Sequence, residues 1–489
     1  MEGTFRTKVT RRGLLRSTIG VAGVAAAGVL LAACASQPAA SPTTAPAPTT
    51  APATSKTPAA GATPAASTKG VAKVQGKISV WQIKLFTQAA NDLSKSDITK
   101  FATQNGWEVD ISEVPTDAMA KLMAGIESGD LPDLFQGSGE LPQLYGSDAT
   151  VDVTSVVKDL EGTNGTTVKL VQRGGQFKGK WWGIPWFMYA DAYFGRKDVL
   201  DAAGKKLDDT QTFDDRRNLA LELSDASKPL WGWGMTPKAA TGDGDILARH
   251  VVNSFGGSVN DDSGTKVVFN SPETVAAMNW LLETYTDPKF KNMLPDGILG
   301  WDGGANNNNF LGGKIIFTQN ASSLYWAAKN QNNPYKDKIV LGKFPKGPKF
   351  DLMGGYPYYH MTFKKSKNQD AAIAIGTFMA QSVQAIARTK IAEGQSWPVY
   401  QNQVDSKDVK DYIGSDNALE VLFKNCTHPS GWMVGWPSTP NAAINACYNQ
   451  NLPDKCMEDV VNKKDTVQNL VKQYHDRMVD IFKQYGYNQ

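Results

Sequence analysis

Aromatic side chains and a few acidic residues are the groups in this chain that could do chemistry with a ligand. The 489 residues include 13 tryptophans, and tryptophan is an unusual choice for a protein surface unless something binds there. Glu140 closely follows a short predicted strand at 134–135, and the carboxyl ends of strands are where α/β sheets hold ligands. These residue types therefore suit the noncovalent binding of a small ligand.

Motifs for catalysis and for bound metals or cofactors are missing from the sequence. It contains no Gly-x-Ser-x-Gly, no His-Glu-x-x-His and no P-loop. The segment Gly137-Ser138-Gly139 lacks the third glycine of a dinucleotide fingerprint, and the four histidines are scattered without metal-ligand spacing. We expect no catalytic residues, no metal and no cofactor.

The charge of the chain is close to balanced. Its formal net charge is +3, and the basic residues of the N-terminal segment account for the excess. No basic stripe is visible, so a nucleic-acid partner is not expected.

The N-terminal segment is typical of an export signal that ends in a lipid anchor. Arg11 and Arg12 precede an apolar run, 19–33, that is too short and too rich in Ala and Gly for a membrane span. "TRRGLLR" resembles a twin-arginine signal and "LAAC" resembles a bacterial lipobox ending at Cys34. We therefore predict a signal peptide at 1–33, lipidation of Cys34, and a disordered Ala/Pro/Ser/Thr linker within 34–76.

Strands alternate with helices after the linker, which predicts an α/β fold with crossover helices. Predicted strands include 77–81, 107–111 and 189–194. Met119, Leu122 and Ile126 share one face of a predicted helix at 116–128 that Gly129 ends. Further helices are predicted at 213–224, 272–286 and 457–484.

A series of motifs resembles the extracellular solute-binding proteins of family 1, the sugar-capturing receptors of ABC importers that include maltodextrin-binding proteins. The series begins with a strand, a proline turn, a helix ending in Ser-Gly-Asp, and Pro-Asp before a strand. It continues with "GKWWGIPWFMYADAYFGRKDVLDAAG", "FGGSVNDDSGTKVVFNSPETVAAMNWL", "FLGGKIIFTQNASSLYWAA" and "GGYPYYHMTFKKSKNQDAAIAIGTFM". Two places depart from the family pattern: Phe194-Gly195-Arg196, and "QTFDD" at 211–215 in place of Pro-Lys-Thr-Trp-Asp-Glu.

The resemblance implies two α/β lobes with a ligand cleft between them and three hinge crossings. We expect these crossings near Pro185, Phe344 and Trp397. Lobe one would comprise 77–185 plus 345–395, and lobe two 186–344 plus 396–489.

The resemblance also implies which residues contact a sugar. Aromatic planes would cover the apolar ring face, and acidic groups would bind the hydroxyls. The expected ligand-contacting residues are Trp81, Glu140, Trp186, Tyr189, Asp191, Trp326, Gly355, Tyr356, Trp432 and Trp436.

Three cysteines remain after Cys34, and the exported setting permits a disulfide. Cys447 and Cys456 flank a turn between two predicted helices, so we expect this pair. Cys426 with Cys447 is the alternative.

The expected function is that of a monomeric lipoprotein, anchored at the outer face of the bacterial cytoplasmic membrane, that delivers a neutral di- or oligosaccharide to an ABC permease. A polyol, a glycerol phosphate or a peptide is an alternative ligand. A secreted carbohydrate-active enzyme is a rival function, since it needs only two carboxylates flanking a cleft.

Overall fold

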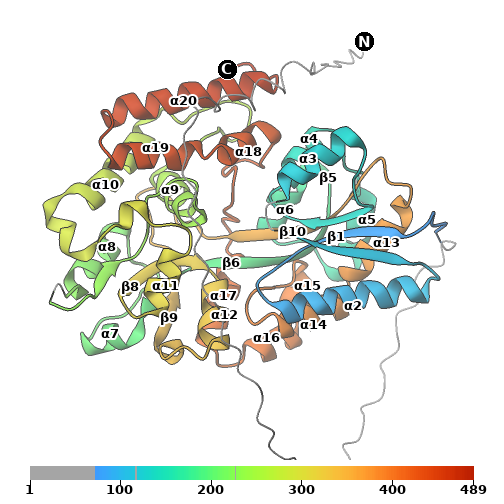
Figure 1. Cartoon of the computed structure of the whole chain (residues 1–489), viewed down its shortest axis with the longest axis horizontal. Helices are drawn as coiled ribbons and strands as arrows, with labels where there is room; N and C mark the ends of the chain where they lie inside the picture. The colour runs from blue at the N-terminus through green and yellow to red at the C-terminus, as the bar shows by residue number, and fades with distance from the viewer. Residues whose placement is uncertain (1–71, 116–117, 226) are drawn as a thin grey trace, which may run out of the picture. The chain divides into compact units, whose positions relative to one another are not determined.

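The computed structural model describes residues 72–115, 118–225 and 227–489. The predicted signal peptide, Cys34 and nearly all of the predicted linker lie outside these residues. Within the described part, eight strands form one mixed sheet in the order β2-β1-β3-β10-β6-β8-β7, with β9 paired to β6 beside this path (Figure 1). These strands are β1 (Ile78–Ile83), β2 (Val109–Val114), β3 (Leu134–Gly137), β6 (Ile184–Arg196), β7 (Trp231–Trp233), β8 (Ile315–Ala321), β9 (Ile339–Gly342) and β10 (Gly355–Thr362). A hairpin of β4 (Gln176–Phe177) and β5 (Lys180–Trp181) stands apart from the sheet.

Helices cover the sheet and extend beyond both of its ends. They are α2 (Gln88–Gln104), α3 (Met119–Ser128), α4 (Leu141–Gly146), α5 (Thr154–Asn164), α6 (Lys169–Gly175), α7 (Lys197–Ala202), α8 (Phe213–Leu223), α9 (Gly242–Phe255), α10 (Pro272–Thr286), α11 (Ala305–Leu311), α12 (Ser323–Asn330), α13 (Gln369–Met379), α14 (Ser382–Ile391), α15 (Gln401–Val404), α16 (Lys407–Ile413), α17 (Asn417–Cys426), α18 (Ala442–Asn449), α19 (Leu452–Val461) and α20 (Val467–Gln484). None of the described helices is long and apolar enough to cross a membrane.

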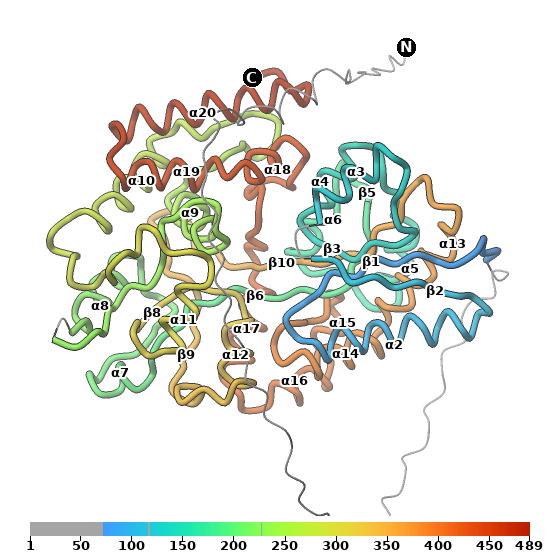
Figure 2. The backbone as a smooth tube through the Cα atoms, viewed as in Figure 1, coloured from blue at the N-terminus to red at the C-terminus, as the bar shows by residue number. Residues whose placement is uncertain are grey.

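Strand β6 connects the two halves of the sheet. Its sequence "IPWFMYADAYFGR" is almost entirely apolar, and all but one of its residues are buried, which is typical of a strand covered on both faces. Residues up to Ala190 pair with β10, whereas those from Asp191 onward pair with β8 and β9. Figure 2 shows β6 and β10, from distant parts of the chain, side by side in the middle.

Two hydrophobic clusters lie on either side of this central pair. One contains side chains of β1, β3 and α13, such as Ile78, Leu134 and Ile375. The other contains side chains of α9, α10 and α20, such as Val251 and Phe482. We call the part around the first cluster, with β1–β3, α2–α6, α13 and α14, lobe one. The part around the second, with β7, β8, α8–α10 and α18–α20, is lobe two. The α/β fold class predicted from the sequence is thus confirmed.

The residue limits predicted for the lobes stay a prediction. Along β6, the change of partner falls between Ala190 and Asp191 and not at Pro185. Leu352 and Met353, which precede β10, still pack in the cluster of lobe two. We propose that these two places are the first and second crossings.

Glycine is required at the start of β10 because neighbouring backbone lies too close for a side chain. A Cβ atom on Gly355 would lie 2.0 Å from the carbonyl oxygen of Tyr189 on β6, and one on Gly354 would lie 1.8 Å from that of Trp432. Three chain segments therefore approach one another closely where the lobes meet.

Several helix boundaries agree with those predicted from the sequence because short-range signals determine them. Helix α10 covers the predicted 272–286, with Ser271 capping it and Pro272 in its first turn. Thr212 and Asp215 form a reciprocal capping box at the start of α8. Gly129 ends α3 in the left-handed conformation, with a φ of 82°.

The single helix predicted at 457–484 is wrong. The chain instead forms α19 and α20, separated by the polar segment 462–466. Lys463 takes a positive φ of 54°, and Thr466 caps the second helix by accepting a hydrogen bond from the Asn469 amide. Apolar residues recur at helical spacing on both sides of this break, so the sequence pattern did not indicate that the helix ends there.

Candidate functional site

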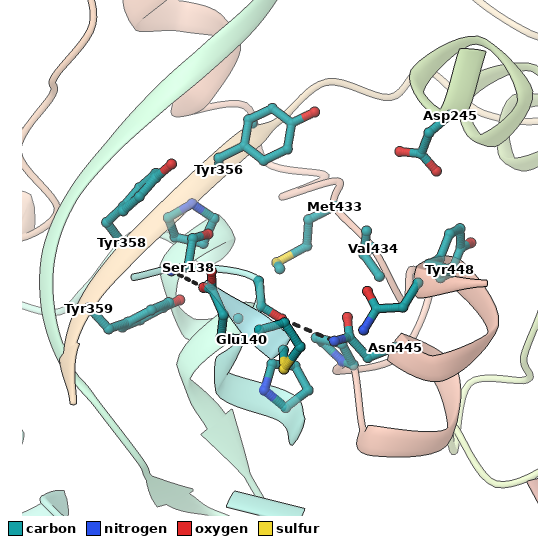
Figure 3. Close-up of a pocket in the computed structure, with 18 of the residues that line it drawn as sticks. Ser138, Glu140, Asp245, Tyr356, Tyr358, Tyr359, Met433, Val434, Asn445 and Tyr448 are labelled. Carbon is teal, nitrogen blue, oxygen red and sulfur yellow. Dashed lines mark hydrogen bonds between the residues drawn. The ribbon is translucent and has the colours of Figure 1, made fainter. Parts of the chain in front are cut away.

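A cavity of about 390 Å³ lies between the two lobes and is bounded on one side by β10. Figure 3 shows tyrosines of β10 on one side and residues of α18 on the other. Its lining residues come from five parts of the chain that are far apart in sequence: 83–142, 174–189, 245–249, 355–359 and 433–449. This volume lies within the range of small-molecule sites, roughly 300–1,000 Å³.

Tyrosines form the wall on the side of the central strands. Tyr189 and Tyr356 are register partners on β6 and β10, with ring centroids 5.0 Å apart, and Tyr358 lies 5.8 Å from Tyr189. Tyr359 also lines the cavity, and its hydroxyl donates to the Val171 carbonyl at 2.8 Å. Burial raises the pKa of Tyr189 and Tyr356 well above the usual value, so the hydroxyls stay protonated and can donate hydrogen bonds.

Glu140 contributes a carboxylate at the end of β3. Its side chain turns back toward the strand, and Oε2 accepts a hydrogen bond from the Ser138 amide at 2.9 Å. Only 6% of the residue is exposed. The charged group is therefore held in place beside the cavity that Ser138 and Gly139 also line.

Helix α9 presents a fixed ion pair. Arg249 donates from Nε and Nη2 to Oδ2 of Asp245, at 3.3 and 3.0 Å, and its guanidinium lies 4.4 Å from the ring centroid of Trp432. Trp432 is held in turn by a 2.9 Å hydrogen bond from Nε1 to Oδ1 of Asn253. Burial acts to lower the pKa of Arg249, but Asp245 and other nearby groups outweigh it and raise the pKa. Arg249 is thus a permanent cation in the cavity wall.

The opposite wall comes from the C-terminal part of the chain. Met433 and Val434 lie on the turn before α18, and Asn445 and Tyr448 lie on α18 itself (Figure 3). Asn445 donates from Nδ2 to the Gly139 carbonyl at 3.0 Å. This wall combines apolar contacts with amide and hydroxyl groups.

Four of the predicted site residues line the cavity together: Glu140, Tyr189, Gly355 and Tyr356. Asp191 lies behind this wall, almost fully buried, where it forms a hydrogen bond with the Tyr356 side chain. Its Oδ1 atom has no hydrogen-bond partner.

None of the five predicted tryptophans lines this cavity. Trp186 packs in lobe one between His360 and the Arg388 guanidinium, at centroid distances of 4.6 and 4.2 Å. Trp432 is buried under Arg249, and Trp436 packs edge-on against Phe350.

The remaining two tryptophans are half-buried elsewhere. Trp81 on β1 lies under the Lys121 ammonium, 3.8 Å from its ring centroid, and Trp326 lies on α12. A contact between these tryptophans and a ligand stays a prediction.

Sequence reasoning missed several lining residues although signals for them exist. In "GGYPYYHMTF" the two-residue period of a strand places Tyr358, which was not predicted, on the same face as the predicted Tyr356. Asp245 and Arg249 have the i,i+4 spacing of a helical ion pair. The loop "SGWMVGWPS" lines the cavity through Met433 and Val434, whereas its Trp432 and Trp436 pack in the hydrophobic cluster of lobe two.

The predicted disulfide between Cys447 and Cys456 is wrong, and so is its alternative. Cys426, Cys447 and Cys456 are all free and buried. Cys447 and Cys456 belong to the hydrophobic cluster of lobe two, where a thiol packs like a small apolar group. Burial raises the pKa of both thiols, so they are protonated and unreactive. No group of described residues is arranged to hold a metal ion.

Asp191 provides a pH-dependent contribution to stability. Burial, opposed by Arg249 and reinforced by Asp243 and Asp245, raises its pKa to about 7 from the usual 3.8. Between about pH 4 and pH 7 the unfolded chain loses this proton while the folded chain keeps it, so this residue makes the free energy of unfolding fall as pH rises.

Replacing Asp191 by asparagine is expected to remove this fall. Relative to the unchanged protein, the variant should gain stability from pH 4 to pH 7, by about 1.4 kcal/mol for each unit of pKa difference. Denaturant unfolding at several pH values checks this, with the exposed Asp296→Asn as control. A stability difference that is constant across this range would contradict the assignment.

Comparison with known proteins identifies the class. Residues 98–415 match the family described as "Bacterial extracellular solute-binding protein". The match covers more than half of the chain, so the protein belongs to this family. A sequence search of curated proteins gives no match.

Solved structures of solute-binding proteins share the fold. An ABC transporter solute-binding protein from Thermotoga lettingae, bound with α-D-tagatose, has 15% identity and a TM-score of 0.67 over 83% of this chain and 100% of that one. A maltose-bound T. maritima protein has 19% identity and a TM-score of 0.66, again over 83% and 100%. A Listeria monocytogenes substrate-binding protein in complex with cycloalternan has 20% identity and a TM-score of 0.66, over 85% and 100%.

Proposed function

We propose that this chain is the substrate-binding lipoprotein of a bacterial ABC importer and that it captures a neutral di- or oligosaccharide. The observation that carries the proposal is the cavity between the lobes, in which tyrosine rings face carboxylate, guanidinium and amide groups. Rings can pack on the apolar face of a sugar, and the polar groups can bind its hydroxyls. The sugars named for the solved relatives, tagatose, maltose and cycloalternan, are consistent with this ligand class.

Capture would proceed by closure of the lobes. Periplasmic binding proteins close around their ligands by hinge motion, and a ligand that contacts both lobes only in the closed state favours that state. Here the same sugar would contact Tyr356 and Glu140 on one side and Asn445 and Tyr448 on the other. The closed receptor would then deliver it to the permease without catalysis.

Other ligands and activities are less well supported. Arg249 is the only lysine or arginine among the lining residues of the described chain, and Asp245 already engages it, which disfavours a glycerol phosphate. A polyol keeps the hydroxyls that these groups bind and is the closest alternative. The enzyme alternative predicts product formation when the protein is incubated with oligosaccharides.

Addition of the correct sugar is expected to raise the melting temperature. At a ligand concentration 100 times Kd, binding adds about 2.7 kcal/mol to the free energy of unfolding. A thermal-shift screen of mono-, di- and oligosaccharides, polyols and peptides measures this. Tyr356→Ala should abolish the shift, whereas Tyr335→Ala, the same change outside the cavity, should leave it intact. A shift with peptides alone would refute the carbohydrate proposal.

We propose further that Cys34 carries the lipid anchor and that export places the monomeric protein at the outer face of the cytoplasmic membrane. Mass spectrometry of the mature N-terminus tests this proposal, because a lipid-modified Cys34 is expected as the first residue. An intact Met1 on the exported protein would refute it.

A further inference from the structure

The two lobes touch directly at the rim of the cavity, away from β6 and β10. Helix α4 of lobe one lies beside α18 of lobe two (Figures 1 and 2). Gln143 donates from Nε2 to the Ala442 carbonyl at 2.9 Å, and the Tyr145 hydroxyl donates to the Pro440 carbonyl at 2.6 Å. The bond from Asn445 to the Gly139 carbonyl, at 3.0 Å, is a third connection between the lobes.

The Tyr145 side chain is held firmly within lobe one. The Tyr145 ring stacks on Phe177 at a centroid distance of 4.5 Å. The Gln143 Oε1 atom accepts a hydrogen bond at 3.3 Å from the hydroxyl of Tyr485, which follows α20 in lobe two, and this is a fourth connection between the lobes. The Tyr145 side chain is therefore pre-organised by its ring stack, and it loses little freedom when the contact between the lobes forms.

Close packing accompanies the hydrogen bonds. A Cβ atom on Gly146, at the end of α4, would lie 2.7 Å from the Cβ atom of Ala442 on α18. Two carbon atoms cannot approach so closely, so the lobes would have to move apart. The glycine at position 146 thus permits the contact between the two helices.

We propose that the contact between 143–146 and 440–442, which we call the rim latch, stabilises the closed state through protein groups alone and so sets the ligand affinity. Every bond in it joins two groups of this chain. The latch therefore favours closure equally for every ligand. The affinity part of the inference rests on the function proposed above, whereas the effect on closure does not.

The expected size follows from population arithmetic. Apparent Kd equals the intrinsic Kd divided by the fraction of molecules in the binding-competent state. A neutral hydrogen bond contributes on the order of 1 kcal/mol, which corresponds to about a five-fold change in the ratio of closed to open molecules. Loss of the whole latch should exceed this factor.

Gly146→Ala is the direct test because alanine suits a helix better than glycine but would collide with Ala442. Ala442→Gly removes the opposing methyl group, so the double variant should regain the contact. Spin labels on Ser147→Cys and Gln450→Cys, both exposed, report the distance between α4 and α18 in the full chain. The native cysteines of the described chain are buried and should stay unlabelled.

We expect Gly146→Ala to lower the closed-to-open ratio of the ligand-free protein at least five-fold and Ala442→Gly to restore it. Tyr145→Phe, which keeps the ring stack, should lower the ratio about five-fold. The Kd values of two different sugars should weaken together, with their ratio unchanged. Unchanged distances in Gly146→Ala, or a double variant that stays open, would overturn the inference. If distances respond but no sugar binds, the latch stands and the carbohydrate function fails.

Discussion

Arg249→Met is expected to lower the free energy of unfolding by about 1.5–3 kcal/mol, the usual contribution of a hydrogen bond to a charged group, since Asp245, with 28% of its side chain exposed, can be partly hydrated once the cation is gone. Arg249 is 3% exposed, and its positive charge lies beside the carboxyl groups of Asp245 and Asp191. Without it, Asp245 has no cation beside it. Asp191, whose pKa is already raised by burial, loses the cation that opposes this shift. Methionine fills similar space, so the loss should come from charge and not from a cavity.

Urea unfolding at pH 7 measures this effect, and a double variant isolates the ion pair. Arg249→Met combined with Asp245→Asn should be less destabilised than the sum of the two single changes. Arg477→Met provides the control because Arg477 lies outside this cluster, beside Tyr474. A loss below about 1 kcal/mol in Arg249→Met would contradict the importance of the pair.

Gly355→Ala is expected to produce the second large effect, at the junction of β6 and β10. The added Cβ would meet the Tyr189 carbonyl oxygen at 2.0 Å, and no side-chain rotation can move either atom away. The strands must separate where Tyr189 and Tyr356 face each other. We expect the free energy of unfolding to fall by several kcal/mol, as in other severe backbone and overpacking changes. We also expect sugar binding to be lost.

Gly162→Ala is the matched control for this prediction. Gly162 lies within α5, and a Cβ atom there would meet nothing within 4 Å. The same substitution should therefore be neutral or stabilising, by up to about 1 kcal/mol. Denaturant unfolding and ligand-induced thermal shift measured on both variants provide the comparison. A Gly355→Ala variant as stable as Gly162→Ala would refute the steric argument.

Local signals predicted the fold well because they act over a few residues. Ser271 with Pro272 marks the start of α10, and Gly129 marks the end of α3. The continuous apolar run around Tyr193 indicates a strand buried on both faces. The family resemblance added the order of the motifs along the chain. That order indicates which distant segments pair in the sheet, and the periodicity of single helices and strands cannot supply this information.

The candidate site was predicted in its location more than in its residues. Whether Trp432 or its neighbour Met433 faces the cavity depends on the path of an irregular loop, which no periodic pattern records. Trp432 turns inward because Asn253 binds its Nε1 and Arg249 covers its ring. Asp191 and Asp245 come together beside Arg249 only through the pairing of β6 with β8 and the position of α9, and these are features of the tertiary structure.

The order of strands in the sheet also has a consequence for how the chain is made. The sheet places β10, residues 355–362, between β3 and β6, which are synthesised much earlier. At a ribosomal rate of about 5–20 residues per second, β3 waits on the order of ten seconds or more for its neighbour. Lobe one therefore cannot be obtained from any continuous fragment that stops before β10. A truncated chain of this kind should expose unpaired strand edges and aggregate, so nascent chains need protection until most of the protein has been translated.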